Sequence, residues 1–486
     1  MTETALTTPA LDDTERRLID ACDSLLPDTL ALTSDLVREY SVQGQERGVL
    51  AVMERAFKRL DLPVERVPLE PGDEPCLAPT AHGASTGHGA SHAAGSHVRS
   101  GDEPGGEDDG GGDGAAVARL WAPGGGAAHP PSWPDAATRC NLVSVLNGTS
   151  TRPHLVFNGH LDVVPAEPVS MWTRAPWEPY EKDGWLYGRG AGDMKAGIAA
   201  MVMAVAAMQR AGLAIDFPLT LQTVIEEECT GNGALACLSH GHGGDFVLIP
   251  EPFGAKLIAG QVGVLWFRVA LDGVPAHVLN TSAGTNAIEA LQALMAPLKA
   301  MEAELNAERE PPYDALAHPF NLSIGRVEGG NWASSVPSHA SLEGRVGFPP
   351  GMAVEAVMAR VERCVEAARD AMGDGVSNVR VDFHGFRSEG HLVDLGASGI
   401  RLLESCHRDL TGSPLEQSLL TCTTDLRAFH VAGGIPGTCY GPVAERIHGV
   451  DECVDIASIQ HTLRAYALFL HRWGKAARDL GATAPG

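Results

Sequence analysis

The sequence contains few basic residues, few cysteines and no apolar run of membrane-spanning length. Lys and Arg number 36 against 61 Asp and Glu, which gives a formal net charge of −25. A chain this acidic is a poor partner for nucleic acid or for an anionic membrane surface. The longest apolar stretch that could form a helix, residues 197–208, is too short to cross a bilayer. We therefore expect neither a nucleic-acid partner nor a membrane-bound protein.

Cysteine pairs and targeting signals are also scarce. The ten cysteines are scattered along the chain without a C-x-x-C pair, which is typical of reduced, mostly buried thiols in a cytosolic protein. Residues 1–17 carry neither the basic region nor the apolar region of a secretory signal. The sequence therefore predicts a cytoplasmic location.

One long segment lacks the large apolar residues from which a core is built. Residues 71–135 are rich in Gly, Ser, His and Asp, and this composition cannot bury enough surface to offset the entropy of ordering the chain. We interpret the segment as a disordered insertion in a surface loop. A metal-buffering role is the alternative, since the segment contains histidines that could bind metal: His82, His88, His92 and His97.

The rest of the chain alternates between strand-like and helical stretches, and its length of 486 residues predicts two or more domains. The first part is expected to hold amphipathic helices at 14–40 and 45–60, a buried helix at 195–212, and strands at 62–70, 140–148, 153–159, 218–226 and 245–250. This alternation predicts an α/β layer with a mostly parallel sheet flanked by helices.

A second pattern begins near Gln261. Strand, helix, strand, strand, helix and strand are expected in turn between 261 and 387, and this β-α-β-β-α-β order is the ferredoxin-like signature. The α/β pattern resumes at about 388. We therefore predict a catalytic domain in two parts, residues 1–260 and 388–486, with a smaller α+β domain, residues 261–387, inserted between them.

Acidic residues and histidines follow several predicted strands or border glycine-rich turns. They are His160, Asp162, Asp193, Glu226, Glu227, Glu228, Glu251 and His448. In open α/β sheets, sites form at the carboxyl ends of strands, so these segments could converge. Each pattern alone also has a simpler interpretation, because an H-x-D can be a surface pair and an E-E-E can be a solvated turn.

Two imidazoles and three carboxylates, one of them shared, form a suitable ligand set for two divalent metal ions. A paired site needs a bridging carboxylate, and Asp193 can approach closely enough because glycines surround it. His160 would be a ligand, and Asp162 would accept a hydrogen bond from an imidazole and fix its tautomer. Within the triple Glu, one carboxylate could bind metal while a free neighbour takes a proton from water.

Five motifs then occur in a recognisable order: NGHLDVVPA (158–166), GRGAGDMKAG (188–197), EEECTGNGA (226–234), IPEPFG (249–254) and HGVDECV (448–454). Together they resemble the metal-site motifs of the acetylornithine deacetylase, succinyl-diaminopimelate desuccinylase and carboxypeptidase G family of metallopeptidases. The resemblance covers most of the chain outside 71–135. It implies a zinc-peptidase-like α/β fold with a dinuclear zinc site, in which cobalt could replace zinc.

The resemblance also implies a role for each motif residue. The metal ligands would be His160 and Glu251 for one ion, Glu228 and His448 for the other, and Asp193 as the bridge. Glu227 resembles the general base that activates water. The family usually has Asp-Glu-Glu where this chain begins with Glu226, but that position is not a ligand.

The predicted inserted domain resembles the family's lid and dimerisation domain. In GVPAHVLNTSAGTNAIE (273–289), His277 resembles the His that reaches the active site of a partner subunit and stabilises the oxyanion. Arg345 resembles the Arg that binds a substrate carboxylate, a task suited to its forked donors. Asn331 is a candidate in the same pocket, and Thr424 could donate a hydrogen bond to substrate. The resemblance therefore implies a homodimer.

These expectations combine into one predicted activity. The chain is expected to be a cytosolic dizinc amidohydrolase that cleaves an N-acyl amino acid, in the manner of an acetylornithine deacetylase. A desuccinylase, or a dipeptidase or carboxypeptidase acting on short peptides, is the alternative within the family. A binding protein that keeps the fold but not the chemistry would be expected to lose ligands or the base, and here all of them are present.

Overall fold

The computed structural model describes residues 11–69, 139–372 and 375–482. The expected insertion at 71–135, with its histidines, lies outside the described residues. Its predicted disorder and the metal-buffering alternative therefore stay predictions.

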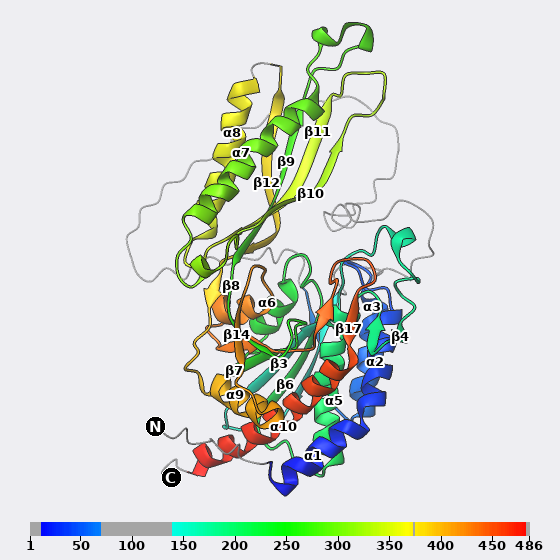
Figure 1. Cartoon of the computed structure of the whole chain (residues 1–486), viewed down its shortest axis with the longest axis vertical. Coiled ribbons are helices and arrows are strands. Elements are labelled where there is room, and N and C mark those ends of the chain that lie inside the picture. The colour runs from blue at the N-terminus through cyan, green and yellow to red at the C-terminus, as the bar shows by residue number, and fades with distance from the viewer. Residues whose placement is uncertain (1–10, 70–138, 373–374, 483–486) are drawn as a thin grey trace, which may run out of the picture.

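The larger layer is built on a six-stranded sheet in the order β1-β2-β6-β3-β7-β15. In that order, its strands are Glu65–Pro68, Cys140–Leu146, Leu219–Val224, Leu155–His160, Phe246–Ile249 and Gly437–Cys439. The last four strands pair in parallel, and β1 and β2 pair antiparallel at one edge. The central strands are buried along their whole length, as strands covered on both faces must be. The predicted mostly parallel sheet is confirmed (Figure 1).

Helices flank this sheet. They are α1 Asp13–Ser24, α2 Leu26–Arg38, α3 Arg47–Arg59, α5 Ala196–Arg210, α6 Asn232–Ser239, α9 Ser398–Thr411 and α10 Ile456–Ala482. The single helix expected at 14–40 is wrong, because α1 ends at Ser24 and α2 starts anew at Leu26 with Pro27 in its first turn. Proline has no N–H to continue the ladder of α1, yet its fixed φ suits the start of a helix.

The apolar helix α5 lies at the centre of the larger layer. It packs against β3, α1, α2 and α10, and every residue from Ala196 to Met208 is buried. The helical span Ala191–Arg210 has the length and hydropathy to cross a bilayer, but 94% of its 18-residue apolar window is buried inside the protein. The apolar stretch 197–208 is thus part of a longer helical span, and burial in the core is the reason for its apolar sequence.

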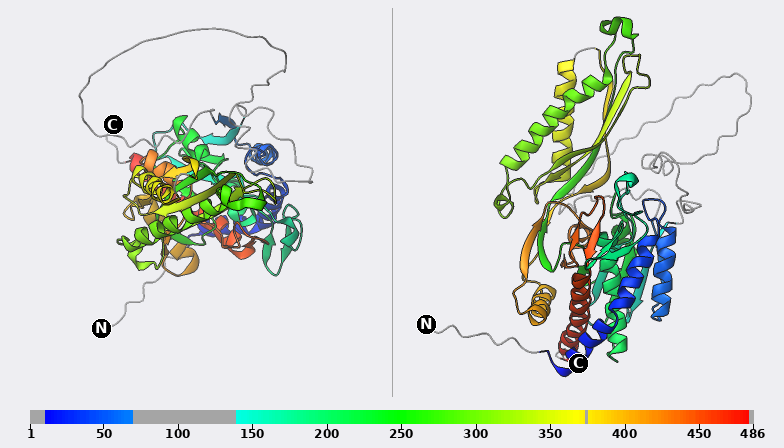
Figure 2. Two further views of the ribbon diagram at one scale, coloured as in Figure 1. Left: turned by 90° about the horizontal axis from the view of Figure 1, so that it is seen from above. Right: turned by 45° about the vertical axis from the view of Figure 1, so that its right-hand side comes forward.

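The smaller layer is a four-stranded antiparallel sheet in the order β10-β11-β9-β12. Its elements in chain order are β9 Gly263–Asp272, α7 Ala287–Ala307, β10 Leu322–Gly329, β11 His339–Phe348, α8 Val354–Met372 and β12 Ser377–Ser388. Figures 1 and 2 show α7 and α8 on one face of this sheet, which extends away from the larger layer. The predicted ferredoxin-like order of elements is confirmed. The domain limits 1–260, 261–387 and 388–486 stay a prediction.

The described residues also form two smaller sheets, apart from the six-stranded and the four-stranded sheet. The first joins β13 His391–Leu392, β8 Lys256–Gln261 and β14 Glu416–Leu420, and the second joins β16 Ala444–Glu445, β17 Cys453–Asp455, β5 Trp185–Tyr187 and β4 Tyr180–Lys182. Short helical turns lie at Val169–Met171, Ala191–Lys195, Val278–Ala283, Tyr313–Ala315 and Ala428–Ala432. Because β5 pairs with β17, the loop after β5 lies beside the loop that precedes β17.

Candidate metal centre

Three neighbouring parallel strands bring the predicted site residues to one edge of the sheet. His160 is the last residue of β3, Glu227 and Glu228 follow β6, and Glu251 follows β7. Since β3 lies between β6 and β7 and all three run in parallel, their carboxyl ends meet at the same edge. His160, Glu227 and Glu251 are buried there.

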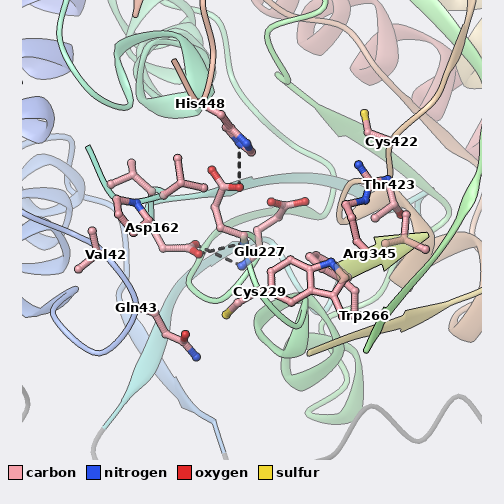
Figure 3. Close-up of a pocket in the computed structure, with 16 residues that line it drawn as sticks. Val42, Gln43, Asp162, Glu227, Cys229, Trp266, Arg345, Cys422, Thr423 and His448 are labelled. Atoms are coloured by element: carbon pink, nitrogen blue, oxygen red, sulfur yellow. Dashed lines mark hydrogen bonds and ion pairs between the residues drawn. The ribbon is translucent and has the colours of Figure 1, made fainter. Parts of the chain in front are cut away.

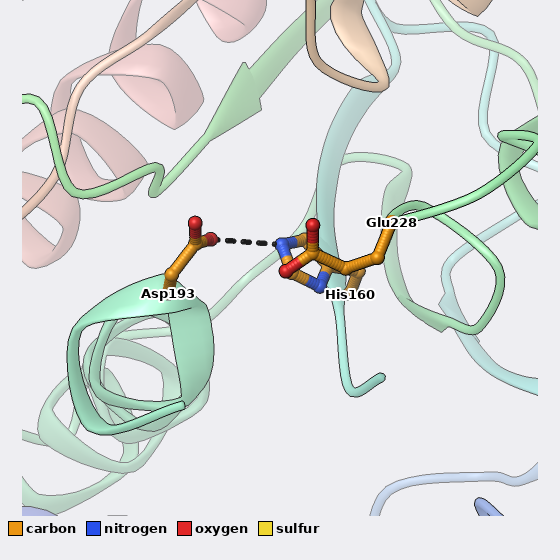
Figure 4. A group of neighbouring side chains, drawn as sticks. All are labelled: His160, Asp193 and Glu228. Atoms are coloured by element: carbon orange, nitrogen blue, oxygen red, sulfur yellow. Dashed lines mark hydrogen bonds and ion pairs between the residues drawn. The ribbon is translucent and has the colours of Figure 1, made fainter. Parts of the chain in front are cut away.

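Asp193 and His448 enter the same site from the paired loops of β5 and β17. One oxygen of Asp193, Oδ1, lies 3.1 Å from His160 Nε2, and the other, Oδ2, lies 3.4 Å from His448 Nε2. His448 Nε2 is also 3.1 Å from Glu228 Oε2. His160, Asp193 and Glu228 offer ligand atoms within 4.8 Å of one another (Figure 4).

Asp162 supports this cluster differently from the prediction. The imidazole N–H of His160, at Nδ1, donates to the backbone carbonyl of Asp162 at 2.9 Å, while the carboxylate Oδ1 lies 3.7 Å away. This contact makes Nδ1 the donor and leaves Nε2 to face Asp193. The Asp162 carboxylate instead accepts the backbone N–H groups of Glu227 and Glu228, at 3.2 and 3.1 Å. Its role is to hold the loop that carries both glutamates.

The electrostatics of the cluster favour a bound cation. Burial, with the charges of neighbouring carboxylates, raises the pKa of Glu227 and of Glu251. Burial alone would also raise the pKa of Asp193, but hydrogen bonds with His160 and His448 lower it. The same contact with Asp193 raises the pKa of His160 even though burial opposes its charge. Carboxylates thus outnumber the two imidazoles, of which His160 is buried and His448 is about half exposed.

The donor set fits divalent metal ions. Imidazole nitrogen and carboxylate oxygen are the ligands that zinc accepts in proteins, and a carboxylate whose two oxygens face different imidazoles has the arrangement of a bridge. Asp425 adds a further buried carboxylate, whose oxygens have no hydrogen-bond partner among the described residues. Burial raises its pKa to about 6. The sequence analysis singled out its neighbour Thr424 but not this residue.

Glu226 faces away from the cluster. Its carboxylate pairs with Arg139 and accepts a hydrogen bond from Thr230 Oγ1 at 2.7 Å. Arg139 also pairs with the fully buried Glu46. The first glutamate of the triple thus anchors the loop to β2 and α3, while the next two turn toward the site.

A buried glutamate that the sequence did not indicate fixes the Asp193 loop. Glu452 accepts backbone N–H groups from Gly190, Gly192 and Asp193 at 3.1, 2.9 and 3.0 Å. It also pairs with the buried Arg189 at 2.5 Å, and Arg189 donates to the carbonyl of Gly449, next to His448. The pair therefore ties the Asp193 and His448 loops together. The sequence signal that could have identified Glu452 is its position in GVDECV, four residues after His448.

Replacing Glu452 by Gln is expected to lower metal affinity about 10–100-fold, as loss of an outer partner of metal ligands does. An amide keeps the size of the side chain but removes the charge that pairs with Arg189 and leaves one end unable to accept N–H groups. Competition with a chromogenic chelator measures the affinity. Glu416→Gln, at an exposed pair with Lys256, is the matched control. Unchanged affinity in Glu452→Gln would contradict this role.

A cavity of about 250 Å³ opens beside the cluster (Figure 3). Glu227, Glu228 and His448 line it on the metal side, and Arg345 lines it from β11. The expectation for Thr424 is corrected, because its buried hydroxyl accepts hydrogen bonds from Gln261 Nε2 at 2.8 Å and from the Leu426 N–H at 3.1 Å. Its neighbour Thr423 lines the cavity instead, with a hydroxyl that has no partner within the described part of the chain.

His277 and Asn331 lie apart from the cavity that Arg345 lines. Both follow strands of the smaller sheet at the end that points away from the larger layer (Figure 1), and both are exposed. Asn331 lines a different cavity, formed by the segments 278–289 and 329–337. Within one chain, therefore, the expectation that Asn331 shares the pocket of Arg345 is wrong, since nearly the whole length of β11 separates them.

Comparison with known proteins gives a consistent result. The family model described as peptidase family M20/M25/M40 matches residues 156–472. The N-formyl-4-amino-5-aminomethyl-2-methylpyrimidine deformylase of Bacillus subtilis is 28% identical over 357 residues, covering 68% of this chain and 83% of that protein. The succinyl-diaminopimelate desuccinylase of Delftia acidovorans is 30% identical over 356 residues, covering 69% and 86%.

The fold is shared with solved structures as well. A dipeptidase from Saccharomyces cerevisiae superposes with a TM-score of 0.72 over 95% of this chain and 98% of that one. The sequences are only 14% identical, so this likeness concerns the fold.

Proposed function

The chain belongs to peptidase family M20/M25/M40, and from this we propose that it is a dizinc amidohydrolase that removes the acyl group from a small N-acyl amino acid. The family consists of metal-dependent hydrolases of amide bonds. The proposal adds the two zinc ions, for which cobalt could substitute, and the class of substrate. It also includes a cytoplasmic homodimer.

The observation that carries the proposal is the position of Asp193. Its two carboxylate oxygens face two different imidazoles, at 3.1 Å from His160 and 3.4 Å from His448. This supports Asp193 as a bridge, with His160 and Glu251 as ligands of one ion and Glu228 and His448 as ligands of the other. Ions bound there would supply Lewis-acid catalysis, which polarises the scissile carbonyl and makes water more acidic.

The protein side chains would do the rest of the chemistry. Glu227 lines the cavity, and its Oε2 lies 3.8 Å from His160 Nε2. In the proposed reaction it takes a proton from the attacking water and passes it to the leaving amine, so the carbonyl–nitrogen bond breaks and a carboxylic acid and an amine result. Arg345 would hold the carboxylate of the substrate with its forked donors. His277 and Asn331 would act across a dimer, in the partner's site.

Relatives in the family keep three substrate classes open. The named relatives are a desuccinylase, a deformylase and a dipeptidase, so a desuccinylase or a dipeptidase is the second candidate for this chain. A non-catalytic binding protein is disfavoured because the proposed ligands and Glu227 are all present and converge.

The proposal is tested by hydrolysis of acylated amino acids and dipeptides with zinc-loaded protein, with and without a chelator. Release of an amine that stops on chelation and returns on adding zinc supports the proposal. Release that is insensitive to the chelator contradicts it, because the site would then work without its metal ions.

A further inference from the structure

The cavity beside the metal centre has two contrasting walls. The arginine wall consists of Val264, Trp266, Arg345, Phe386, Cys422 and Thr423, and the valine wall consists of Val42, Gln43, Val163, Val164 and Pro165. Figure 3 shows Glu227 between the two, with Arg345 and Trp266 on one side and Val42 and Gln43 on the other. A substrate whose amide is attacked near Glu227 must therefore place its two halves against different walls.

The arginine wall combines one cation with aromatic surface. Trp266 and Arg345 are direct partners across β9 and β11, so their side chains leave the same face of the smaller sheet. The Trp266 ring meets the Phe386 ring edge-on at 5.6 Å. Two nitrogens of Arg345, Nε and Nη2, are buried without a partner among the described residues. This wall can pair with a carboxylate and cover an apolar side chain at the same time.

The charges that line the cavity exclude further ionic groups on the substrate. Its acidic residues are Asp162, Glu227 and Glu228, and all three belong to the metal centre or hold its loops. Among the described residues that line the cavity, none is left to pair with an ammonium on the arginine wall. The valine wall, as far as the structure describes it, contains no Lys or Arg to pair with a carboxylate of an acyl group. An ionic group buried there without a partner would weaken binding strongly.

We propose that the substrate is an N-acyl amino acid with a short, uncharged acyl group and an uncharged apolar or aromatic side chain. This inference rests on the amidohydrolase function proposed above. The substrate carboxylate pairs with Arg345, the side chain packs on Trp266 and Phe386, and the acyl group lies against the valine wall. The class differs from acetylornithine, which has a side-chain ammonium, and from succinyl-diaminopimelate, which has an acyl carboxylate and a distal ammonium.

The volume of the cavity agrees with this assignment. About 250 Å³ lies just below the range of roughly 300–1,000 Å³ that is usual for small-molecule sites. A single acylated amino acid fits that space better than a longer peptide.

The test compares kcat/KM of zinc-loaded protein on four substrates. We expect kcat/KM for N-acetyl-L-phenylalanine and N-acetyl-L-leucine to be about 100-fold or more higher than for N-acetyl-L-ornithine and N-succinyl-L,L-diaminopimelate. The reason is that a polar group left without a partner in a binding site lowers kcat/KM by about this factor. N-acetylphenethylamine, which lacks the carboxylate, is expected to be as poor as the charged substrates. Its hydrolysis at the rate of N-acetyl-L-phenylalanine would overturn the role of Arg345.

Substitutions test whether the arginine wall selects the side chain of the substrate. Trp266→Ala is expected to lower kcat/KM for N-acetyl-L-phenylalanine about 10–100-fold by removing its packing surface, and Trp266→Phe is expected to restore most of it. Phe383→Ala is the matched control, since Phe383 lies on β12 with Phe386 but does not line the cavity. Thermal melting of each variant separates loss of packing with substrate from loss of folding. An equal fall for Phe383→Ala would overturn the assignment.

The outcomes separate this inference from the proposed function. Higher kcat/KM on N-acetyl-L-ornithine or N-succinyl-L,L-diaminopimelate overturns the substrate class and leaves the amidohydrolase standing. Absence of hydrolysis on every substrate, by protein that holds its zinc, overturns the proposed function and the substrate class with it.

Discussion

Replacing Glu227 by Gln is expected to lower kcat by about 10²–10⁴-fold, the usual contribution of general acid–base catalysis, while metal content stays the same. Glu227 lines the cavity and lies 3.8 Å from His160 through Oε2. Gln has nearly the same shape but cannot take a proton from water or return one to the leaving amine. The backbone of residue 227 would still donate to Asp162, so the loop should keep its place.

The experiment measures turnover and bound metal on the same preparation. Glu181→Gln, at an exposed position on β4, is the matched control and should match the unmodified protein in both. Wild-type turnover by Glu227→Gln would remove Glu227 as the base. A loss of metal together with turnover would instead make Glu227 a ligand.

Replacing Asp193 by Asn is expected to weaken binding of both metal ions by at least about 100-fold, more than the loss of an outer partner, and to abolish turnover at ordinary metal concentrations. The reason is that its two oxygens face both histidines of the site. An amide carries no charge, and its NH₂ group would point at one metal position with no lone pair to offer.

Isothermal titration with zinc measures this loss and the number of ions bound. Asp183→Asn is the matched control, because Asp183 lies in an exposed turn with a positive φ that Asn also tolerates. Binding of one ion with unchanged affinity by Asp193→Asn would show that Asp193 serves a single metal position and does not bridge.

The sequence predicted that most of the candidate site residues would converge, because these residues follow regular features. His160 ends an apolar strand, and Glu228 and Glu251 follow two others within a few residues. Parallel strands bring such residues to one edge of a sheet. The smaller layer was predictable for a similar reason, since its alternation of strands and long helices leaves few other topologies. These predictions use local pattern and a general rule of sheet architecture, and both operate over short stretches of chain.

Other parts depended on contacts that no local pattern records. Glu452 accepts N–H groups from a loop more than 250 positions earlier, so its role arises only when β17 pairs with β5. In an irregular segment, the sequence does not show which of two adjacent side chains faces a cavity. Here Thr423 lines the cavity, whereas Thr424 is hydrogen-bonded to Gln261. His160 Nδ1 lies 2.9 Å from the carbonyl oxygen of Asp162 and 3.7 Å from its carboxylate. The sequence does not record a difference of under 1 Å, so it could not show which of the two groups accepts the hydrogen bond.

The most direct test of the account is a metal titration of demetallated protein. Zinc is added in steps, and bound metal per chain and hydrolysis of N-acetyl-L-phenylalanine, N-acetyl-L-ornithine and N-succinyl-L,L-diaminopimelate are measured on each sample. A dizinc amidohydrolase is expected to show no hydrolysis without metal and full activity as the content approaches two zinc ions per chain. Full activity at a metal content near zero would contradict it.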